Sequence, residues 1–280
     1  METEVRNDIF TQQSLILVDN SIERKQLVSF IPQSKADFNN SSRTIEIDIP
    51  ARDSYYLPSK SYIKIKGRLV RANDTAYDAN TEIALINNAI MYLFSTIEYS
   101  LGGKTMETLN FPGHTTSMLG YLSYPDDFNC SAGLNQCWRK DTNVNAISAK
   151  YMPSRAVAAV AAAAASPEIP EGHFTPRENP DYNEGYAIRR SLLMSNDTPG
   201  QFSFIVPFSH MFAFAEYIKV LYNLRHTLKF VRADDNSAIH RPNDVGAGKI
   251  VLNDIRWVIP ELKPSIGMRT ELMESVKNKK

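Results

Sequence analysis

The hydrophobic period of the chain changes within one short stretch, Glu82–Glu107, and this change constrains the fold more than any other feature. The apolar side chains first recur at spacings of three and four, which predicts a helix over Glu82–Phe94. They then recur at every second position over Ile97–Leu101, which predicts a strand, and Gly102 and Gly103 predict a hairpin turn. The stretch therefore predicts a helix that leads directly into a β-hairpin.

Alternating apolar and polar side chains predict further half-buried strands. These strands are expected over Arg43–Ile49, Tyr62–Val70, Phe202–Val206, His226–Val231 and Lys249–Ile259. Pro50 and Pro260 are expected to end two of them, and Gly67 is placed where a bulge or bend would fall. The predicted fold is all-β, an eight-stranded jelly-roll sandwich of two sheets with short helices and one long loop insertion.

The same patterns divide the chain into regions. Residues 1–40 are expected to form an N-terminal arm, residues 41–265 a single jelly-roll domain and residues 266–280 a C-terminal helix or linker. Within the domain, the residues after Pro112 predict a short amphipathic helix with Met118, Leu119 and Leu122 on its apolar face.

The region 126–200 has weak periodicity and many prolines, so it is expected to be a long loop insertion, either a functional projection or a flexible segment. It contains Ala156–Ala165, which is nearly pure alanine and is interpreted as a helical or disordered spacer. Aromatic side chains of the insertion either contact other subunits or pin the loop to its own sandwich, and both interpretations stay open: Tyr151, Phe174, Tyr182 and Tyr186.

The composition weighs against several classes of protein. The 280 residues include 31 basic and 31 acidic side chains, so no global field attracts nucleic acid or an anionic membrane, although a local patch remains possible. The N-terminus lacks the pattern of a signal peptide and no apolar run reaches the length of a membrane span. Synthesis in the cytosol is therefore expected, with no secretion, no membrane span and no sequence-specific binding of nucleic acid.

The cysteines and histidines carry little sign of chemistry. Cys130 and Cys137 are too few for a disulfide framework, so buried or incidental thiols are expected, with a redox or bridging role as the alternative. No metal-binding arrangement of two histidines occurs, and all five are expected to be structural or on the surface: His114, His173, His210, His226 and His240.

Motifs for nucleotide binding and nucleophilic catalysis are also missing. Gly102–Thr105 resembles the end of a phosphate-binding loop, but Glu98 occupies the position of the required glycine. After Lys249, Ile250 replaces the hydroxyl residue that would hold magnesium. The adjacent pairs Asp126-Asp127 and Asp234-Asp235 are expected to cap backbone amides in turns. The sequence thus predicts no catalytic, cofactor-binding or metal-binding residues, and no enzyme.

Several blocks resemble one family. Asn87-Asn88, Leu93–Ser95 and the IEYSLGGKTM strand and turn resemble a block of the major capsid proteins of Maverick/Polinton-type DNA elements and adintovirus-like viruses. Further similar pieces follow the same order along residues 40–265: YIKIKGRLV, MLGYLSYPDD, NPDYNEGYAIRR, PFSHMFAF, HTLKFVRADDNSAIHR and GKIVLNDIRWVIPELKPS.

The resemblance implies a subunit of a double jelly-roll shell. In that family two sandwiches stand side by side and three copies form a pseudo-hexagonal capsomer. This chain has residues for one sandwich, so it is interpreted as a truncated gene, an exon, a host-captured relic or a single-sandwich coat component. The implied partners are two further copies, as a homotrimer, and neighbouring penton or minor capsid proteins, and the implied location is the virion.

Three functions follow from these observations. The leading one is a structural capsid protein that self-assembles into a virion shell, without catalysis, cofactor or small-molecule substrate. The second is a monomeric β-sandwich that binds carbohydrate or a receptor. The third is an enzyme on a jelly-roll scaffold, which would need a constellation of residues that the sequence does not show.

Overall fold

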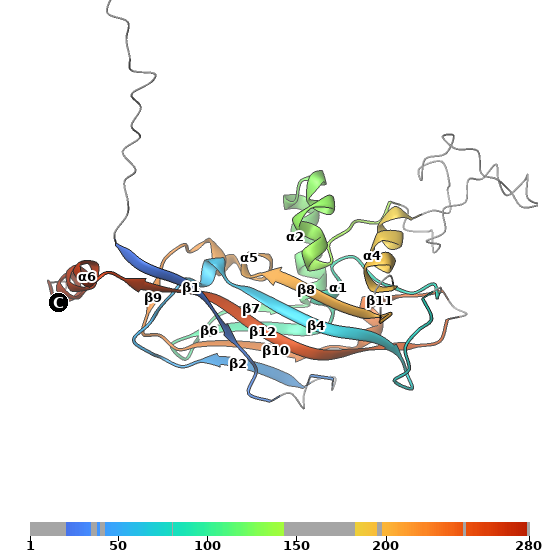
Figure 1. The fold of residues 1–280 in the computed structure, drawn as a ribbon, viewed down its shortest axis with the longest axis horizontal. Helices are drawn as coiled ribbons and strands as arrows, with labels where there is room; N and C mark the ends of the chain where they lie inside the picture. Colours follow the sequence, from blue (N-terminus) through green and yellow to red (C-terminus); the bar gives the residue numbers. More distant parts are fainter. Residues whose placement is uncertain are drawn as a thin grey trace, which may run out of the picture.

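The computed structural model of the protein describes residues 21–34, 38–39, 43–79, 81–142, 183–194, 198–242 and 245–278. Eight long strands of this part form the sandwich in Figure 1. In chain order they are β1 (Ile22–Phe30), β2 (Thr44–Ile49), β4 (Tyr62–Arg71), β6 (Phe94–Leu101), β7 (Lys104–Asn110), β8 (Gln201–Pro207), β10 (His226–Arg232) and β12 (Gly248–Pro264).

The pairing of these strands has a simple rule. The first strand pairs with the last, β1 with β12, and the second with the seventh, β2 with β10. The third pairs with the sixth, β4 with β8, and the two middle strands, β6 and β7, form a hairpin. One long hairpin is thus folded over two sheets, with the orders β1-β12-β4-β8 and β2-β10-β6-β7. This is the jelly-roll order, and it confirms the predicted fold class.

Shorter elements complete the sheets and their connections. β3 (Tyr55–Tyr56) pairs with β12 and β9 (Leu221–Tyr222) with β3, while β5 (Ala84–Leu85) pairs with β11 (Ile239–His240). The helices are α1 (Ala89–Tyr92), α2 (Pro112–Ser123), α4 (Glu184–Met194), α5 (Phe208–Met211) and α6 (Ile266–Asn278). Short 3₁₀ helices are η2 (Pro58–Lys60), η3 (Asp126–Cys130), η4 (Ala132–Gln136), η6 (Ala213–Glu216) and η7 (Asp235–Ala238).

The core lies between the two sheets, where every second side chain of each strand points inward. Tyr99 and Trp257 are among the largest fully buried side chains, and their rings meet edge to face with centroids 6.1 Å apart. Isoleucines supply most of the remaining inner face, because their branched side chains pack well on a pleated sheet: Ile45, Ile47, Ile49, Ile63, Ile65, Ile97 and Ile255.

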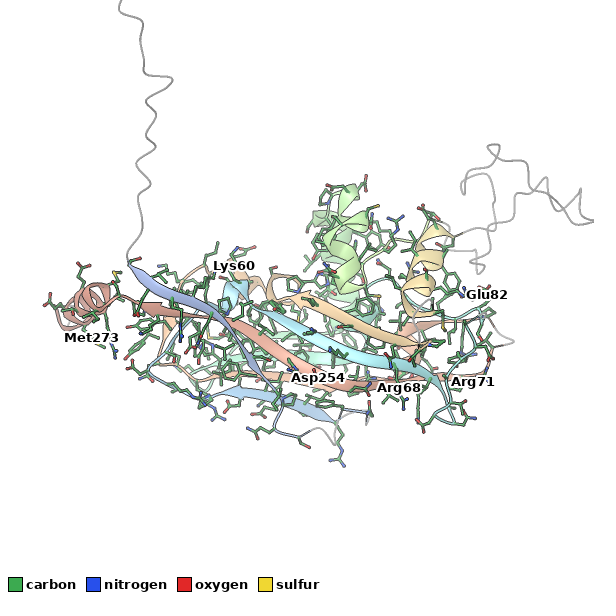
Figure 2. The ribbon with its side chains drawn as sticks, in the orientation of Figure 1. Lys60, Arg68, Arg71, Glu82, Asp254 and Met273 are labelled. Atoms are coloured by element: carbon green, nitrogen blue, oxygen red, sulfur yellow. The ribbon has the colours of Figure 1, made fainter. Side chains whose placement is uncertain are left out.

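The sandwich is elongated, and its two ends carry different elements. α6, with Met273, lies at one end, whereas Arg71 and Glu82 lie at the other (Figure 2). α2 and α4 stand on one side of the sandwich, with α4 toward the end that carries Glu82 (Figure 1). The described residues between β7 and β8, 111–142, 183–194 and 198–200, therefore build a raised layer on the jelly roll.

The predicted strands and hairpin are largely confirmed. β2, β4, β8 and β10 coincide with the strands expected from the alternation, and β2 ends before Pro50 as predicted. Gly102 and Gly103 have φ angles of 58° and 83°, which suits the two central positions of a tight hairpin turn. Beside Gly67, the register shift lies in the partner strand, between Leu252 and Asp254, and the Gly67 backbone itself packs under the Phe202 ring.

The helix predicted over Glu82–Phe94 is wrong for most of its length. Only Ala89–Tyr92 is helical, because Ala84 and Leu85 form β5 and Phe94 already belongs to β6. Asn88 has a φ of 61°, a left-handed conformation that cannot continue a right-handed helix. The three- and four-residue spacing arises because an irregular segment is buried on several sides, with Ile83 and Ile90 both fully buried.

Pro260 does not end the last strand as predicted. β12 continues to Pro264, and Pro260 pairs with Leu27 of β1. On its other side, β12 pairs with β4 as far as Val258 and with β3 from Glu261, so Pro260 lies between the two ladders. Its carbonyl accepts a hydrogen bond of 3.0 Å from the Leu57 amide, and the missing proline N–H costs no ladder bond.

Two predicted regions contain more structure than expected. The arm predicted over residues 1–40 includes β1, which lies along β12 as the first strand of the jelly roll. The loop insertion predicted over residues 126–200 includes the 11-residue helix α4. The alanine tract Ala156–Ala165 lies outside the described residues.

Candidate interaction surface

The raised layer begins at Phe111, directly after β7. Phe111 has a φ of 50°, which turns the chain away from the sheet, and Pro112 then starts α2 with a backbone angle suited to the first helical turn. The inward face of α2 carries compact side chains, because its buried residues are Pro112, Gly113, Thr116 and Gly120. The helix therefore lies very close to the groups beneath it.

Two aromatic rings fill the space under these glycines. A Cβ atom added to Gly120 would lie 2.7 Å from both Cζ2 and Cζ3 of Trp138, and one added to Gly113 would lie 2.6 Å from Cδ1 of Tyr92. Trp138 is fully buried, so the helix and this ring pack without a gap. The Gly120 contact packs α2 on Trp138 within the raised layer, and the Gly113 contact packs it on Tyr92 of α1.

A buried polar network joins α2 to Asn88, which precedes α1, and to His210 on α5. The side-chain amide of Asn88 donates to the Thr116 and Ser117 hydroxyls, at 2.7 and 3.0 Å, and its oxygen lies 3.0 Å from Nε2 of His210. Because the Asn88 oxygen is an acceptor, Nε2 must donate and Nδ1 must accept. The Tyr124 hydroxyl supplies that hydrogen bond at 2.6 Å.

Burial sets the protonation of this network. Removal from water lowers the pKa of His210 to about 4, since a charged imidazolium has no counterion there. The same cause raises the pKa of the Tyr124 hydroxyl. Both groups are neutral at pH 7, which suits a structural role.

Arg189 holds the second half of the layer. Its Nε donates to the Leu85 carbonyl at 2.8 Å, Nη1 donates to the Arg139 carbonyl, and Nη2 lies 2.6 Å from the Asp141 carboxylate. Asn183 caps α4 by accepting a hydrogen bond of 3.1 Å from the Tyr186 amide. These contacts attach α4 to the segment after η4 and to β5.

The side of α2 that faces away from the sandwich is apolar. We call its exposed residues the helix patch: Phe111, Met118, Leu119, Tyr121 and Leu122. Their exposed fractions lie between 53% and 86%, with Leu122 the highest. The predicted amphipathic helix therefore exists, and its apolar face points away from the sandwich because the glycine and threonine face packs inward.

A second apolar cluster lies before β9. We call Tyr217, Ile218 and Val220 the loop patch, and their exposed fractions are 45%, 66% and 43%. The helix that precedes it, η6, is attached to β7. Both oxygens of the Glu107 carboxylate accept hydrogen bonds of 3.0 Å from the Ala213 and Phe214 amides of η6.

The structure separates the residues that the sequence singled out. Gly102–Thr105 forms the hairpin turn and the start of β7. Cys130 is exposed and Cys137 is buried, and both thiols are free. Tyr186 is fully buried and packs its own segment on the sandwich, whereas Tyr151, Phe174, Tyr182 and His173 lie outside the described residues.

The predicted turn roles of the aspartate pairs are confirmed in part. The Asp234 side chain caps η7 by accepting a hydrogen bond of 2.8 Å from the Asn236 amide. Asp235 instead pairs with the buried Arg232 and accepts a hydrogen bond of 2.8 Å from the Ile250 amide. Arg232 also donates to the Leu93 carbonyl at 2.7 Å, so the pair connects β10, β12 and the end of α1.

Signs of a reaction centre are sparse in the part of the chain that the structure describes. Within it, no three His, Cys, Asp or Glu side chains gather as a metal ion would require. Its helices are all too short or too polar to cross a membrane. The features that stand out are the two apolar patches and the rigid layer that carries one of them.

Comparison with known proteins supports the fold. Residues 182–274 match the family model of a double jelly roll-like domain. Comparison of the sequence with curated proteins gives no match. Among solved structures, a chain of the Sputnik virophage matches over 89% of this chain and 50% of its own length, with 13% identity and a TM-score of 0.50.

Two further matches have lower TM-scores. The major capsid protein of mavirus is covered over 46% of its length and 85% of this chain, with 10% identity and a TM-score of 0.42. The major capsid protein of Faustovirus is covered over 56% of its length and 90% of this chain, with 8% identity and a TM-score of 0.44. The chain thus spans about half the length of the solved proteins that it matches. Its strand order and the Sputnik match together show that it has the jelly-roll fold found in a virophage particle.

Proposed function

We propose that this protein is a structural capsid protein whose activity is self-assembly into a virion shell. The observation that carries the proposal is the strand order, β1-β12-β4-β8 against β2-β10-β6-β7, on a chain that matches a Sputnik virophage protein over 89% of its length. The double jelly roll-like domain matched by residues 182–274 supports the same class of protein.

The physical character of the molecule suits this role. A shell subunit needs a rigid body and surfaces that bind its neighbours, and it needs no reacting groups. The continuous core and the buried Arg189 and His210 contacts supply rigidity. The helix patch supplies an apolar surface of the kind that interfaces use. The proposed role therefore requires no catalytic, cofactor-binding or metal-binding residue, and we propose that the protein is not an enzyme.

The finer assignments are part of the same proposal. The sequence resemblance supports an origin in a Maverick/Polinton or adintovirus-like element and incorporation into a virion, and the proposed place of synthesis is the cytosol. It also supports a homotrimer that contacts neighbouring capsid subunits, including penton or minor capsid proteins. The proposed organisation keeps a jelly roll up to residue 265 and a C-terminal helix or linker over 266–280, but β1, which the sequence assigned to an arm over residues 1–40, belongs to the jelly roll.

Self-association of the purified 280-residue chain tests the proposal. We expect sedimentation velocity to show a discrete oligomer whose population grows with protein concentration, and electron microscopy to show uniform particles. A chain that stays monomeric at every concentration would overturn the proposal. Saturable binding of that monomer to a glycan array would favour the carbohydrate-binding alternative instead.

A further inference from the structure

The outer face of β4 carries a row of positive charges. Lys64, Lys66 and Arg68 occupy every second position of the strand, while Ile63 and Ile65 between them are fully buried. We call these three cations the basic row. In the part of the chain that the structure describes, none of them forms an ion pair. The basic row therefore concentrates unpaired charge in a protein whose formal net charge is zero.

The strands beside β4 leave this charge uncompensated. On the β8 side, Ser203 stands opposite Lys66 and Ile205 opposite Lys64, so the neighbours are neutral. On the β12 side, Asp254 stands opposite Lys66, but its carboxylate lies 2.6 Å from Nε of Arg256, which is itself opposite Lys64. One carboxylate and one further cation cancel, and the charge of the basic row remains.

The outer face of the other sheet differs. Lys229 of β10 stands directly opposite Glu46 of β2 on one side and Glu98 of β6 on the other. Side chains of directly opposite residues share one face of a sheet and interact. A lysine on that face is therefore flanked by two carboxylates, so the surplus of positive charge is a property of the β4 face alone among the two outer faces described.

Lys64 and Lys66 also line an open hollow between the sheet and the raised layer. The hollow has a volume of about 810 Å³, and η4 and α4 contribute its other wall. None of the described residues that line it is an Asp or a Glu. Its neutral polar groups include amides and hydroxyls: Asn135, Thr198, Ser203 and Asn253. The two ammonium groups are thus the only charges in a hollow that offers further hydrogen-bond donors.

This chemistry favours phosphate groups as the ligand. Lysine binds phosphate as a compact point charge, whereas carboxylates are matched best by the planar fork of arginine. Hydroxyl and amide side chains also donate hydrogen bonds to phosphate oxygens. The hollow and the basic row together therefore suit a ligand that carries several phosphates.

The geometry of the basic row suits a linear ligand. Alternate residues of a strand lie about 6.8 Å apart, so the row from Lys64 to Arg68 spans about 14 Å. One strand of a double helix carries a phosphate about every 3.4 Å along the axis, so about four phosphates face three cations. Single strands bind on exposed aromatic rings, but the rings at the hollow, Phe202 and Phe204, are only 7% and 5% exposed. A duplex, whose bases are already stacked, needs no such rings.

We propose that the basic row binds the phosphate backbone of double-stranded nucleic acid without reading its sequence. Each cation that neutralises a phosphate releases a counterion, so the contact weakens as salt is added. Three such contacts make a weak site, with a dissociation constant of about 10⁻⁴ M or higher for a single subunit. The site goes beyond the proposed self-assembly and does not depend on it.

The salt dependence of DNA binding tests the basic row. Fluorescence anisotropy of a labelled DNA duplex measures binding to the full 280-residue chain between about 50 and 200 mM salt. With three phosphate contacts the association constant should fall about 40-fold over this range. Lys64→Gln with Lys66→Gln leaves one contact, so the fall should shrink to about 3.5-fold. Lys64→Arg with Lys66→Arg keeps both charges and should behave like the wild type.

Lys104→Gln with Lys229→Gln is the matched control, because it removes two lysines from the other sheet. It should leave the salt dependence unchanged. Lys66→Gln alone, at an exposed position that tolerates substitution, should give an intermediate fall of about 12-fold. Circular dichroism verifies that each variant is folded.

Three results would overturn the basic row as a nucleic-acid site. The first is no binding by the wild type at about 50 mM salt, and the second is an equal loss of salt dependence in the two glutamine double variants. The third is a change in sedimentation of Lys64→Gln with Lys66→Gln in the absence of DNA, which would assign this face to a contact between copies. A protein that binds DNA as expected but never associates with itself would overturn only the proposed self-assembly.

Discussion

Gly120 lies directly on the indole ring of Trp138, and a Cβ atom at this position would stand 2.7 Å from two carbons of the ring. Real Cβ atoms essentially never show such a distance, and Trp138 is fully buried, so the ring has no room to move aside. One hydrogen atom in place of a methyl group therefore sets how closely α2 approaches the Trp138 ring within the raised layer. The position of the helix patch depends on this contact.

Gly120→Ala should accordingly destabilise the protein, although alanine is the better helix former. Overpacking of a filled core costs about 1 to 3 kcal/mol, and the gain in helix propensity offsets about 1 kcal/mol of that cost. Urea unfolding measures the difference. Gly267→Ala on α6 is the control, because no atom lies within 4 Å of its added Cβ, and we expect a small stabilisation. Equal effects of the two substitutions would contradict the close packing.

Arg189→Met should be among the most damaging single changes. It removes the guanidinium from the Asp141 carboxylate, which keeps the hydrogen bond from the Asn183 amide, and from the Leu85 and Arg139 carbonyls. Each buried acceptor left without its donor costs about 1 to 3 kcal/mol. Amide hydrogen exchange should accelerate first in α4, which Arg189 attaches to the sandwich. Arg68→Met provides the control, since Arg68 is exposed on β4 and should tolerate the change (Figure 2). Surface substitutions usually change the unfolding free energy by less than about 0.5 kcal/mol. A change that small for Arg189→Met would rule out this role for Arg189.

The strands could be predicted because their faces differ. In β2, Ile45 and Ile47 point into the core while Glu46 points away from it, so the sequence alternates as the burial does. Tertiary context outweighs this signal where a segment is buried on all sides. Ile83 and Ile90 mimic a helical stripe, although the chain between them forms β5 and a left-handed turn at Asn88.

The raised layer was harder to predict for a different reason. The contact between Gly120 and Trp138 joins residues whose proximity no local pattern reveals, and Arg189 draws its partners from Leu85, Arg139 and Asp141. One local signal was present for α4, because Asn183 followed by Glu184 is typical of a helix start. For α2 the apolar stripe predicts the helix correctly but not which side it buries.

The two thiols should differ in reactivity. Cys130 is exposed, whereas Cys137 is buried and its burial raises the thiol pKa to about 11, so that almost no thiolate forms at pH 8. Labelling of the folded protein with a maleimide should modify one thiol per chain, and both after denaturation. Cys130→Ser should abolish labelling of the folded protein, and Cys137→Ser should leave it unchanged. Two thiols reacting at the same rate before unfolding would contradict the burial of Cys137.

Acid should weaken the fold through His210. Its folded-state pKa is about 4, below the ordinary value of 6.5, so between these pH values the unfolded chain binds more protons than the native one. Stability is therefore complete above pH 6.5 and falls as the pH drops toward 4, by at most about 1.4 kcal/mol per pH unit for this residue. Urea titrations at several pH values measure the slope.

His210→Gln separates this effect from that of the carboxylates, which also titrate in acid. The amide of glutamine keeps a polar group near Asn88 and Tyr124 but cannot take up a proton. We expect lower stability at pH 7 and a shallower loss between pH 6.5 and 4. His226 serves as the comparison, because burial also lowers its pKa to about 4, and its hydrogen-bond partner is Tyr99 on the neighbouring strand β6. A variant whose slope equals that of the wild type would show that His210 is protonated in the native state as readily as in the unfolded chain.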